Sequence, residues 1–287
     1  MTTSALGTSV AQLSLPEDEG REIKLLTAKE DRYGGVIVEL EEAMEPNAFA
    51  ASLKASMDHW RKQEKNCVWI QLPLRLSSLV DIAVQEGFRY HHAEPDYLML
   101  ACWLPSRPDT LPANASHRVG IGAFVINDHR EVLVVQEKSG AFGGSGVWKF
   151  PTGVVDEGED ICDAAIREVK EETGIDAEFI EVLAFRQSHK GFCGKSDLLF
   201  VCMLKPLSSE IQKQDTEIEA AKWMPLDEYV NQPFIQKHGQ FKQIADICLN
   251  KSNSHYSGFS LQSAKSNSGT TNIIYFNGHD MNRQSLD

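Results

Sequence analysis

The sequence predicts an α+β protein of two domains, and three observations lead to this class. Strand-like and helix-like stretches alternate over residues 22–104, as they do in small α/β domains. Residues 105–117 are expected to form a linker, because they open with three prolines in eight residues and proline interrupts regular structure. A second series of strands follows over residues 118–250, around one long amphipathic helix.

The first domain is expected to contain three strands and two helices. Its clearest element is the first helix, in which apolar residues from Phe49 to Trp60 recur at spacings of four, four and three. The second strand should end at Pro73 and the second helix at Gly87, because both residue types are stop signals. The expected strands are 33–40, 67–73 and 97–103, and the expected helices are 45–60 and 77–86.

The second domain opens with two apolar stretches, 119–126 and 131–137, and the polar residues between them predict a β-hairpin. A glycine-rich loop follows at 139–146. The helix at 159–173 should end at Gly174, because glycine readily adopts the left-handed conformation that closes a helix. The other elements expected are strands 148–150, 177–186, 197–205 and 220–224 and a last helix at 234–249.

The two ends of the chain offer little apolar sequence. Residues 1–21 have neither the basic start nor the long apolar core of a secretory signal, so a disordered tail is expected. Residues 251–287 are rich in Ser, Asn and Gly, and we expect a mostly flexible tail. One candidate strand stands out within it, at 271–277.

Composition argues against several kinds of partner. A formal net charge of −13 is unfavourable for binding nucleic acid or anionic membranes, which attract basic surfaces. No apolar run approaches the roughly 18 residues that span a bilayer. The six cysteines form no CxxC pair, so we expect reduced thiols and a cytoplasmic protein. A phosphorylated substrate is still compatible with the acidic chain, provided that cations accompany it.

Residues 153–175 contain the sequence motif from which the chemistry of the protein is predicted. They read Gly, five residues, Glu, seven residues, Arg-Glu, an aliphatic residue, any residue, Glu-Glu, any residue, Gly and an aliphatic residue. With average residue usage, a chance match at a given start is on the order of 10⁻⁸. The pattern is therefore far more specific than a lone glycine motif.

The acidic residues of this segment predict a divalent-cation site. Glu168, Glu171 and Glu172 stand at i, i+3 and i+4, so they share one side of the helix. Residues 156–172 contain eight acidic and two basic side chains, an excess that suits hard cations such as Mg²⁺ or Mn²⁺. A merely solvated acidic face is the alternative, but it leaves the spacing of the other signature residues unexplained.

The segment is similar to the signature of Nudix hydrolases, and that resemblance implies an α/β/α sandwich with a mixed sheet. It also implies roles: a backbone carbonyl near Gly153 binds the metal, Glu168 and Glu172 are the principal metal ligands, and Glu171 supports them. By the same resemblance, Arg167 orients a glutamate, Glu159 braces the loop–helix junction and metal-activated water attacks a phosphorus. The general base varies between Nudix subfamilies, and the candidates are Glu168 and Glu217; for Glu217 an exposed loop acid is the alternative.

Substrate contacts are expected just after the signature. Arg186, His189, Lys190 and Lys195 are a cationic group in an otherwise acidic chain, and a diphosphate needs such partners. His189 could equally be a surface histidine. Trp148 or Phe124 could stack on a base, although aromatic residues in such positions more often belong to the core. The loop at 139–146 could close over the substrate or serve only as a connection.

The flanking sequences narrow the resemblance. Residues 136–140, 147–155, 184–189 and 219–225 look like those of the plant cytosolic Nudix hydrolases, which act on ADP-ribose and NADH. Residues 31–38 and 90–97 resemble the pre-Nudix domain of that group, which is similar in fold to acetyltransferases. No pyrophosphate loop of the acetyl-CoA type occurs between Leu72 and Asp81, so the first domain is expected to bind, dimerise or set specificity.

The resemblance implies a homodimeric Mg²⁺- or Mn²⁺-dependent pyrophosphohydrolase that releases AMP and ribose 5-phosphate from ADP-ribose, or AMP and reduced nicotinamide mononucleotide from NADH. A close alternative is another nucleoside-diphosphate derivative, such as coenzyme A or a capped nucleotide. A non-catalytic nucleotide sensor is the alternative from another class, and the complete set of glutamates counts against it. Neither a nucleic acid nor a membrane is expected as a partner.

Overall fold

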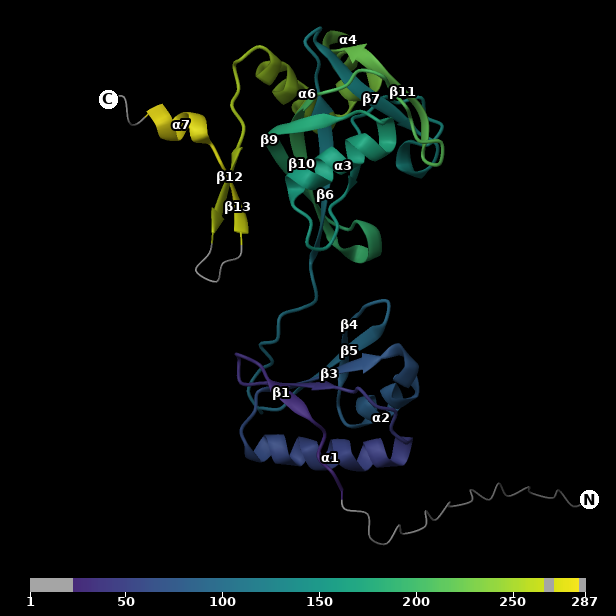
Figure 1. Cartoon of the computed structure of the whole chain (residues 1–287), viewed down its shortest axis with the longest axis vertical. Coiled ribbons are helices and arrows are strands. Elements are labelled where there is room, and N and C mark those ends of the chain that lie inside the picture. The colour runs from purple at the N-terminus through teal and green to yellow at the C-terminus, as the bar shows by residue number, and fades with distance from the viewer. Residues whose placement is uncertain (1–22, 266–270, 284–287) are drawn as a thin grey trace, which may run out of the picture. The chain divides into compact units, whose positions relative to one another are not determined.

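The computed structural model describes residues 23–265 and 271–283, so the tail expected at residues 1–21 lies outside the described residues (Figure 1). The chain divides into two compact units, one up to Asn114 and one from Ala115 onward. Within the described residues, no helix is both long enough and apolar enough for a membrane span.

The first unit is a five-stranded sheet with its helices packed into one core. The strands β1 (Ala28–Glu30), β2 (Val36–Glu39), β3 (Cys67–Pro73), β4 (Arg89–Ala93) and β5 (Tyr97–Trp103) lie in the order β1-β2-β3-β5-β4. Only β2 and β3 are parallel, and the crossover between them is α1 (Pro46–Lys62). The apolar stripe of α1, including Phe49, Leu53 and Met57, is fully buried against this sheet.

The sequence predicted the main elements of this unit and missed two strands. The strands expected at 67–73 and 97–103 and the first helix are confirmed, and the second helix begins as a 3₁₀ turn, Leu74–Leu79, before α2 (Val80–Gln85). β1 and β4 were not predicted. Both are short and largely polar, and they are recognised as strands only through their pairing with β2 and β5.

The second unit is built around a mixed sheet. The strands β6 (His117–Val125), β8 (Thr152–Val154), β9 (Ala177–Ser188) and β10 (Ser196–Pro206) lie in the order β8-β6-β10-β9, with β6 parallel to β10 and the other pairs antiparallel. A second, two-stranded sheet pairs β7 (Glu131–Glu137) with β11 (Ile218–Pro225). Between Asn127 and Glu131 the chain turns from the first sheet to the second.

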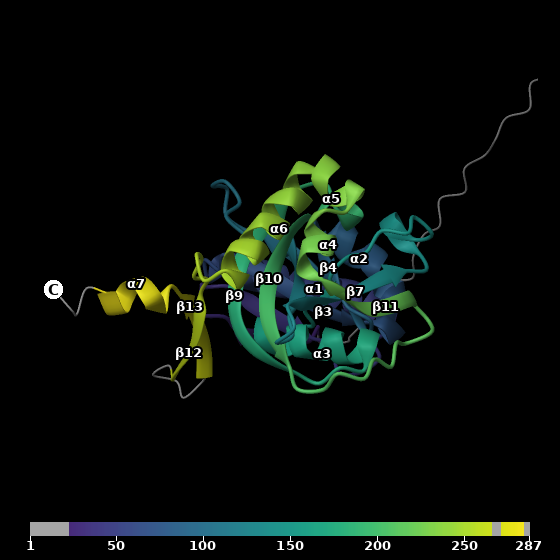
Figure 2. The same ribbon diagram turned by 90° about the horizontal axis from the view of Figure 1, so that it is seen from above.

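Helices cover both faces of the mixed sheet. On β6, Ala123 packs with α3 (Ile161–Thr173), whereas its neighbour Phe124 packs with α6 (Gly239–Ser252). Because neighbouring residues of a strand point to opposite faces, α3 and α6 lie on opposite sides. Figure 2 shows this arrangement, with α3 and α6 on either side of β9 and β10. The fold is therefore layered, and α3 covers the side of the sheet on which the signature lies.

Three predictions for this unit are wrong. Residues 119–126 and 131–137 are not the two strands of one hairpin, because β7 pairs with the distant β11 and meets β6 only at the bridge Ile126–Val132. Residues 148–150 are not a strand: Pro151 has no N–H to donate, and only Lys149 forms a bridge. The expected last helix is broken, because His238 is extended between α5 (Pro233–Lys237) and α6.

The C-terminal segment contains more regular structure than the sequence indicated. The strand expected at 271–277 is present as β13 (Thr271–Phe276). The segment also contains β12 (Ser260–Lys265) and α7 (Gly278–Arg283), which were not predicted. The short helix α4 (Leu226–Val230), earlier in the chain, was not predicted either. Phe259 exchanges both backbone hydrogen bonds with Val182, and the hydroxyl of Tyr256 donates to the carbonyl of Leu183. This stretch therefore covers part of the open edge of β9, which would otherwise present unpaired backbone groups.

Candidate functional site

The loop before α3 is closed by Glu159. The backbone N–H of Asp156 donates to the Glu159 carboxylate at 2.9 Å, and the N–H of Glu159 donates to the carbonyl of Asp156 at 3.1 Å. Gly158 between them has φ +79°, a conformation that favours glycine. The short turn holds the signature glycine strand, β8, close to the start of the helix. The structure thus places Glu159 at the loop–helix junction.

Arg167 joins the acidic residues of the signature. Its Nε and Nη2 donate to both oxygens of Glu159 at 2.7 and 2.8 Å, and its Nη1 donates to Glu168 at 2.8 Å and to Glu171 at 3.3 Å. Nη2 also donates to the carbonyl of Val154 at 3.0 Å. The hydrogen bonds from Arg167 lower the pKa of Glu159, and the acidic partners raise the pKa of Arg167. One guanidinium therefore orients three glutamates and the strand that precedes them.

Gly153 is required because Glu168 occupies the space beside it. A Cβ atom at residue 153 would overlap the Glu168 carboxylate, so any other residue would displace that side chain or the strand. The Glu168 side chain is only 14% exposed. Burial raises the pKa of this carboxyl, and the hydrogen bond from Arg167 opposes the increase. The signature glycine and the first glutamate of the helix thus form one close contact.

Glu172 is the most unusual acid of the site. The residue is 5% exposed, and its Oε2 is buried with no hydrogen-bond partner among the described residues. Burial raises the pKa of Glu172 to about 8, and the positive charge of Lys149 opposes that increase. A buried carboxylate oxygen without a partner is energetically costly, so it indicates a cation or other group that the protein binds there.

The residues present fit a divalent cation. Glu168, Glu171 and Glu172 offer hard carboxylate oxygens on one side of α3, Glu168 lies against Gly153, and one oxygen of Glu172 has no partner among the described residues. Among the described residues, no three His, Cys, Asp or Glu side chains are grouped closely enough to form a complete cage, since Glu168 and Glu171 turn toward Arg167. Mg²⁺ does not need such a cage, because it binds through one or two carboxylates and completes its shell with water and phosphate oxygens.

Arg186 lies in a hollow beside the signature strand. The hollow is about 280 Å³, and its lining includes Arg186, Gly120, Asp197 and residues 152–154. A Cβ at residue 120 would stand 3.0 Å from the Gly153 carbonyl oxygen, so the glycine at 120 keeps this oxygen accessible. The Nε of Arg186 is buried without a hydrogen-bond partner among the described residues, and its Nη1 donates weakly to Gln240 at 3.4 Å.

Arg186 and Glu168 belong to opposite faces of the mixed sheet. Arg186 is in register with Leu199, and Leu199 is in register with Gly120. Gly153, which faces Glu168, is in register with the next residue of β6, Ile121. Because facing alternates along a strand, the guanidinium and the carboxylate approach the short edge strand β8 from its two sides. Residues 152–154 therefore lie beside both the Arg186 hollow and the Glu168 side chain.

The other predicted substrate contacts are more dispersed. His189 and Lys195 lie in the connection between β9 and β10, where the ring of His189 hydrogen-bonds with Ser196 at 2.8 Å. No contact between described residues joins either of them to the glutamates. Trp148 packs at the edge of the core with the ammonium of Lys222 over its ring at 4.8 Å. Phe124 is fully buried, so the core alternative holds for that residue.

Glu217 lies in the loop that leads into β11. Its carboxylate is exposed and accepts a hydrogen bond from Gln214 at 3.1 Å. The same loop is tied to the end of α3, because the N–H groups of Gln212 and Gln214 donate to the carbonyls of Thr173 and Glu172. The structure therefore brings the Glu217 loop beside α3, which bears the signature glutamates, with the Glu217 side chain directed to solvent.

Two residues of the site, Lys149 and Glu137, were not predicted from the sequence. Lys149 is only 8% exposed, and its ammonium contacts Glu137 at 2.8 Å and the Thr152 hydroxyl at 2.6 Å. The only signal was a lysine between two aromatic residues, Trp148 and Phe150, and such a lysine normally lies at the surface with its stem packed. Glu137 ends β7 and is recognised as part of the site only because β7 lies beside Lys149.

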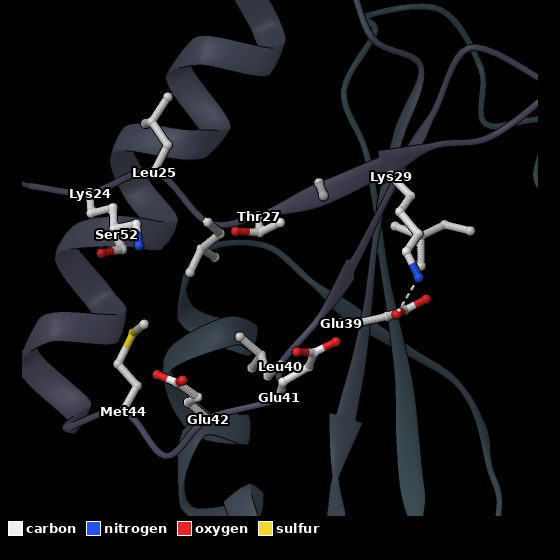
Figure 3. Close-up of a pocket in the computed structure, with 13 residues that line it drawn as sticks. Lys24, Leu25, Thr27, Lys29, Glu39, Leu40, Glu41, Glu42, Met44 and Ser52 are labelled. Atoms are coloured by element: carbon white, nitrogen blue, oxygen red, sulfur yellow. Dashed lines mark hydrogen bonds and ion pairs between the residues drawn. The ribbon is translucent and has the colours of Figure 1, made fainter.

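A different hollow, of about 330 Å³, is found in the first unit between β1, β2 and α1 (Figure 3). Its ion pair joins Lys29 to Glu39 at 2.7 Å, so that cation is already neutralised. Glu41 and Glu42 add further negative charge to its rim. A phosphate group would be repelled there without added cations, so this hollow is a poorer candidate than the glutamate site.

Comparison with known proteins decides the family. Residues 116–246 match the model of the NUDIX domain, and residues 26–104 match a model described as the Nudix hydrolase domain. The chain is 57% identical over 263 residues to Nudix hydrolase 2 of Arabidopsis thaliana, an alignment that covers 91% of this chain and 94% of that protein. The chain belongs to the Nudix hydrolase family.

The similarity to other Nudix hydrolases also extends over much of this chain. Nudix hydrolase 7 of Arabidopsis thaliana is 52% identical over 265 residues, covering 92% of this chain and 94% of that protein. The human protein named nucleoside diphosphate-linked moiety X motif 6 is 39% identical over 206 residues, covering 69% of this chain and 64% of that protein. Nudix hydrolases act on nucleoside diphosphate compounds and generally use divalent ions such as Mg²⁺ or Mn²⁺, which agrees with the donor set described above.

Proposed function

We propose that the protein is a Mg²⁺- or Mn²⁺-dependent pyrophosphohydrolase of ADP-ribose and NADH. ADP-ribose would yield AMP and ribose 5-phosphate, and NADH would yield AMP and reduced nicotinamide mononucleotide. The observation that carries the metal-dependent chemistry is the buried, unpartnered oxygen of Glu172 beside Glu168 and Gly153. The choice of substrate is supported by the sequences that flank the signature, which resemble the ADP-ribose and NADH hydrolases of plants.

The protein groups of the site have separable tasks. Glu172, Glu168 and the Gly153 carbonyl would hold a divalent ion, with Glu171 in support. When bound, the ion supplies positive charge that polarises phosphate oxygens and makes water a stronger acid. Arg167 fixes the orientation of Glu168 through the hydrogen bond at 2.8 Å. Arg186 would donate its unpartnered Nε–H to a phosphate oxygen next to residues 152–154.

Glu168 is the better placed of the two candidate bases. A general base must reach the proton that it accepts, and Glu168 lies against Gly153 whereas the Glu217 carboxylate is exposed and bonded to Gln214. His189, Lys195 and Trp148 remain candidate contacts to the parts of the substrate beyond the diphosphate.

Several expectations from the sequence accompany this proposal. We propose that the protein is a cytoplasmic homodimer, and that the first unit has an acetyltransferase-like fold and serves dimerisation or specificity rather than acyl transfer. The domain boundaries at 22–104 and 118–250 belong to the same proposal. Light scattering that returned the mass of a single chain of 32.0 kDa would contradict the dimer.

A substrate panel tests the proposed activity. The full chain would be incubated with Mg²⁺ and ADP-ribose, NADH, NAD, FAD, ADP-glucose, coenzyme A or a capped nucleotide, and the nucleotide products quantified. Release of AMP from ADP-ribose and NADH is expected, and preferential cleavage of coenzyme A or the cap would favour the close alternative. Binding without product from any compound would leave the nucleotide sensor. Glu172→Gln is the negative control, since it should lose turnover through loss of the metal.

A further inference from the structure

The side chain of Lys149 connects three elements of the second unit at the glutamate site. Its ammonium contacts Glu137 at the end of β7 and the hydroxyl of Thr152 at the start of β8. The backbone N–H of Thr152 in turn favours the charged form of the Glu172 carboxyl on α3 and lowers its pKa. One buried cation therefore links the second sheet, the strand of Gly153 and the helix that bears the signature glutamates.

Such a lysine needs an explanation, because an ammonium group buried to 8% residue exposure loses much of its hydration. Glu137 compensates its charge at 2.8 Å, and the Glu137 side chain is itself only 27% exposed. Replacing a buried ion pair by well-packed apolar residues often costs a protein no stability. The position of this pair next to Glu172 suggests that it serves the site rather than the stability of the fold.

We propose that Lys149, held by Glu137, is a positioning residue for divalent-ion binding: it keeps Thr152, Gly153 and Glu172 in one arrangement. The charge of Lys149 acts more strongly on Glu172 than the charge of Glu137 does, so the pair has an electrostatic effect at the site. The positioning effect is separate from it and acts through Thr152, whose hydroxyl the ammonium binds and whose backbone leads directly into Gly153. The inference rests on the proposed function, since it assumes that the glutamates bind a divalent ion.

Replacing Lys149 separates positioning from simple electrostatics, because the two predict opposite changes. In Lys149→Met, the loss of a positive charge leaves Glu137 unneutralised and by itself should strengthen binding of Mn²⁺. Loss of positioning should weaken it, and removal of groups that orient metal ligands typically costs 10–100-fold in metal affinity. We expect the dissociation constant of Mn²⁺ to rise about tenfold.

Two further variants complete the test. Thr152→Val removes the hydroxyl that Lys149 binds and alters no charge, so electrostatics predicts no change and positioning predicts a similar weakening. Lys242→Met is the matched control: it removes a lysine of the same unit that is 44% exposed and paired with Asp246. Its affinity for Mn²⁺ should stay within about twofold of the unmodified protein, since exposed pairs contribute little.

Mn²⁺ affinity would be measured on the full chain without substrate, from the electron paramagnetic resonance signal of the free ion. Weaker binding by both Lys149→Met and Thr152→Val supports the inference. Unchanged or tighter binding by folded Lys149→Met overturns it, and if that variant does not fold, unchanged binding by Thr152→Val overturns it. If the unmodified protein binds no Mn²⁺ and cleaves no diphosphate, both this inference and the proposed function are overturned. If the unmodified protein binds Mn²⁺ and cleaves the substrate while the variants keep their affinity for Mn²⁺, this inference alone is overturned.

Discussion

At the scale of single residues, the site depends on how a few polar groups share a small, largely buried volume. Arg167 turns Glu159, Glu168 and Glu171 toward itself, and no hydrogen bond joins it to Glu172 among the described residues. Gly153 makes room for Glu168 by lacking a side chain. Arg167 therefore fixes the orientation of the oxygens that it contacts, whereas the buried oxygen of Glu172 is left without a partner among the described residues.

The contact between Gly153 and Glu168 leads to a first prediction. In Gly153→Ala the added methyl group would overlap the Glu168 carboxylate, so the glutamate or β8 must move. Displacements of about 1 Å in a catalytic site can cost on the order of 100-fold in rate, and we expect a loss of that size in kcat/KM. Steady-state hydrolysis of ADP-ribose measures it. Gly144→Ala is the control, since no atom lies within 4 Å of its Cβ position, and an equal loss in both variants would contradict the steric explanation.

The burial of Glu172 leads to a second prediction, on stability and pH. Its pKa is raised to about 8 in the folded protein, above the ordinary value of 4.5, so the folded state holds this proton more tightly than the unfolded state. The stability that results is fully present below pH 4.5 and is lost as the pH rises through about 8. Glu172→Gln cannot ionise, so the metal-free variant should keep this stability while losing catalysis.

Urea unfolding in the presence of a chelator measures this effect. Between about pH 6 and about pH 8.5, the free energy of unfolding of the unmodified protein should fall by about 2 kcal/mol more than that of Glu172→Gln. Comparing the two proteins cancels the titration of all other groups. Parallel pH profiles would show that the carboxyl of Glu172 titrates near its ordinary value. Addition of Mg²⁺ at the higher pH should stabilise only the unmodified protein.

At the scale of elements, the sequence predicted what depends on local contacts and missed what depends on distant ones. The helix α3 and its end at Gly174 are confirmed, because the spacing of the apolar residues and the left-handed glycine, φ +73°, are both local features. The hairpin of residues 119–137 is wrong, because β7 pairs with β11, some eighty residues later. Lys149 was missed for the same reason: its counter-ion Glu137 lies on β7 and becomes its partner only when β7 lies beside residue 149.

The end of α3 leads to a third prediction. In Gly174→Ala the residue must remain at positive φ, and its Cβ would lie 2.8 Å from the Cβ of Gln212 and 3.0 Å from the Gln212 carbonyl oxygen. The strained backbone alone should cost about 1 kcal/mol. The close contact should raise the loss of unfolding free energy to about 2 kcal/mol or more, because the Gln212 loop is hydrogen-bonded to Thr173 and cannot retreat freely.

Gly144→Ala again serves as the control for this prediction. Gly144 has a similar φ of +67°, and its Cβ position has no neighbour within 4 Å, so it should show the cost of the backbone strain alone. Urea unfolding of both variants measures the two losses. Equal losses would mean that the Gln212 loop yields without cost, and the close contact would then contribute nothing to the stability of the helix end.

At the scale of the whole molecule, the chain consists of two units with separate hydrophobic cores. One core lies between α1 and the sheet of the first unit, and two others lie on the two faces of the mixed sheet of the second. All the residues that we assign to the metal and to the diphosphate belong to the second unit. The alternation of strands and helices and the proline-rich stretch at 105–112 indicated this organisation, whereas the faces of the sheet on which Arg186 and Glu168 lie could not be predicted.

The separation of the cores leads to the last prediction. A ligand that binds only the folded state stabilises it by about 2.7 kcal/mol at 100 times its dissociation constant. Because the cation site and the first unit share no core, Mn²⁺ should slow hydrogen exchange in peptides from the second unit, most strongly around β8 and α3, and leave the first unit unchanged. Hydrogen exchange measured by mass spectrometry resolves the two units, and Glu172→Gln should show no response in either. Equal protection of the two units would contradict this prediction, because it would mean that they unfold together. The first unit would then contribute to the stability of the cation site by contacts outside its own core.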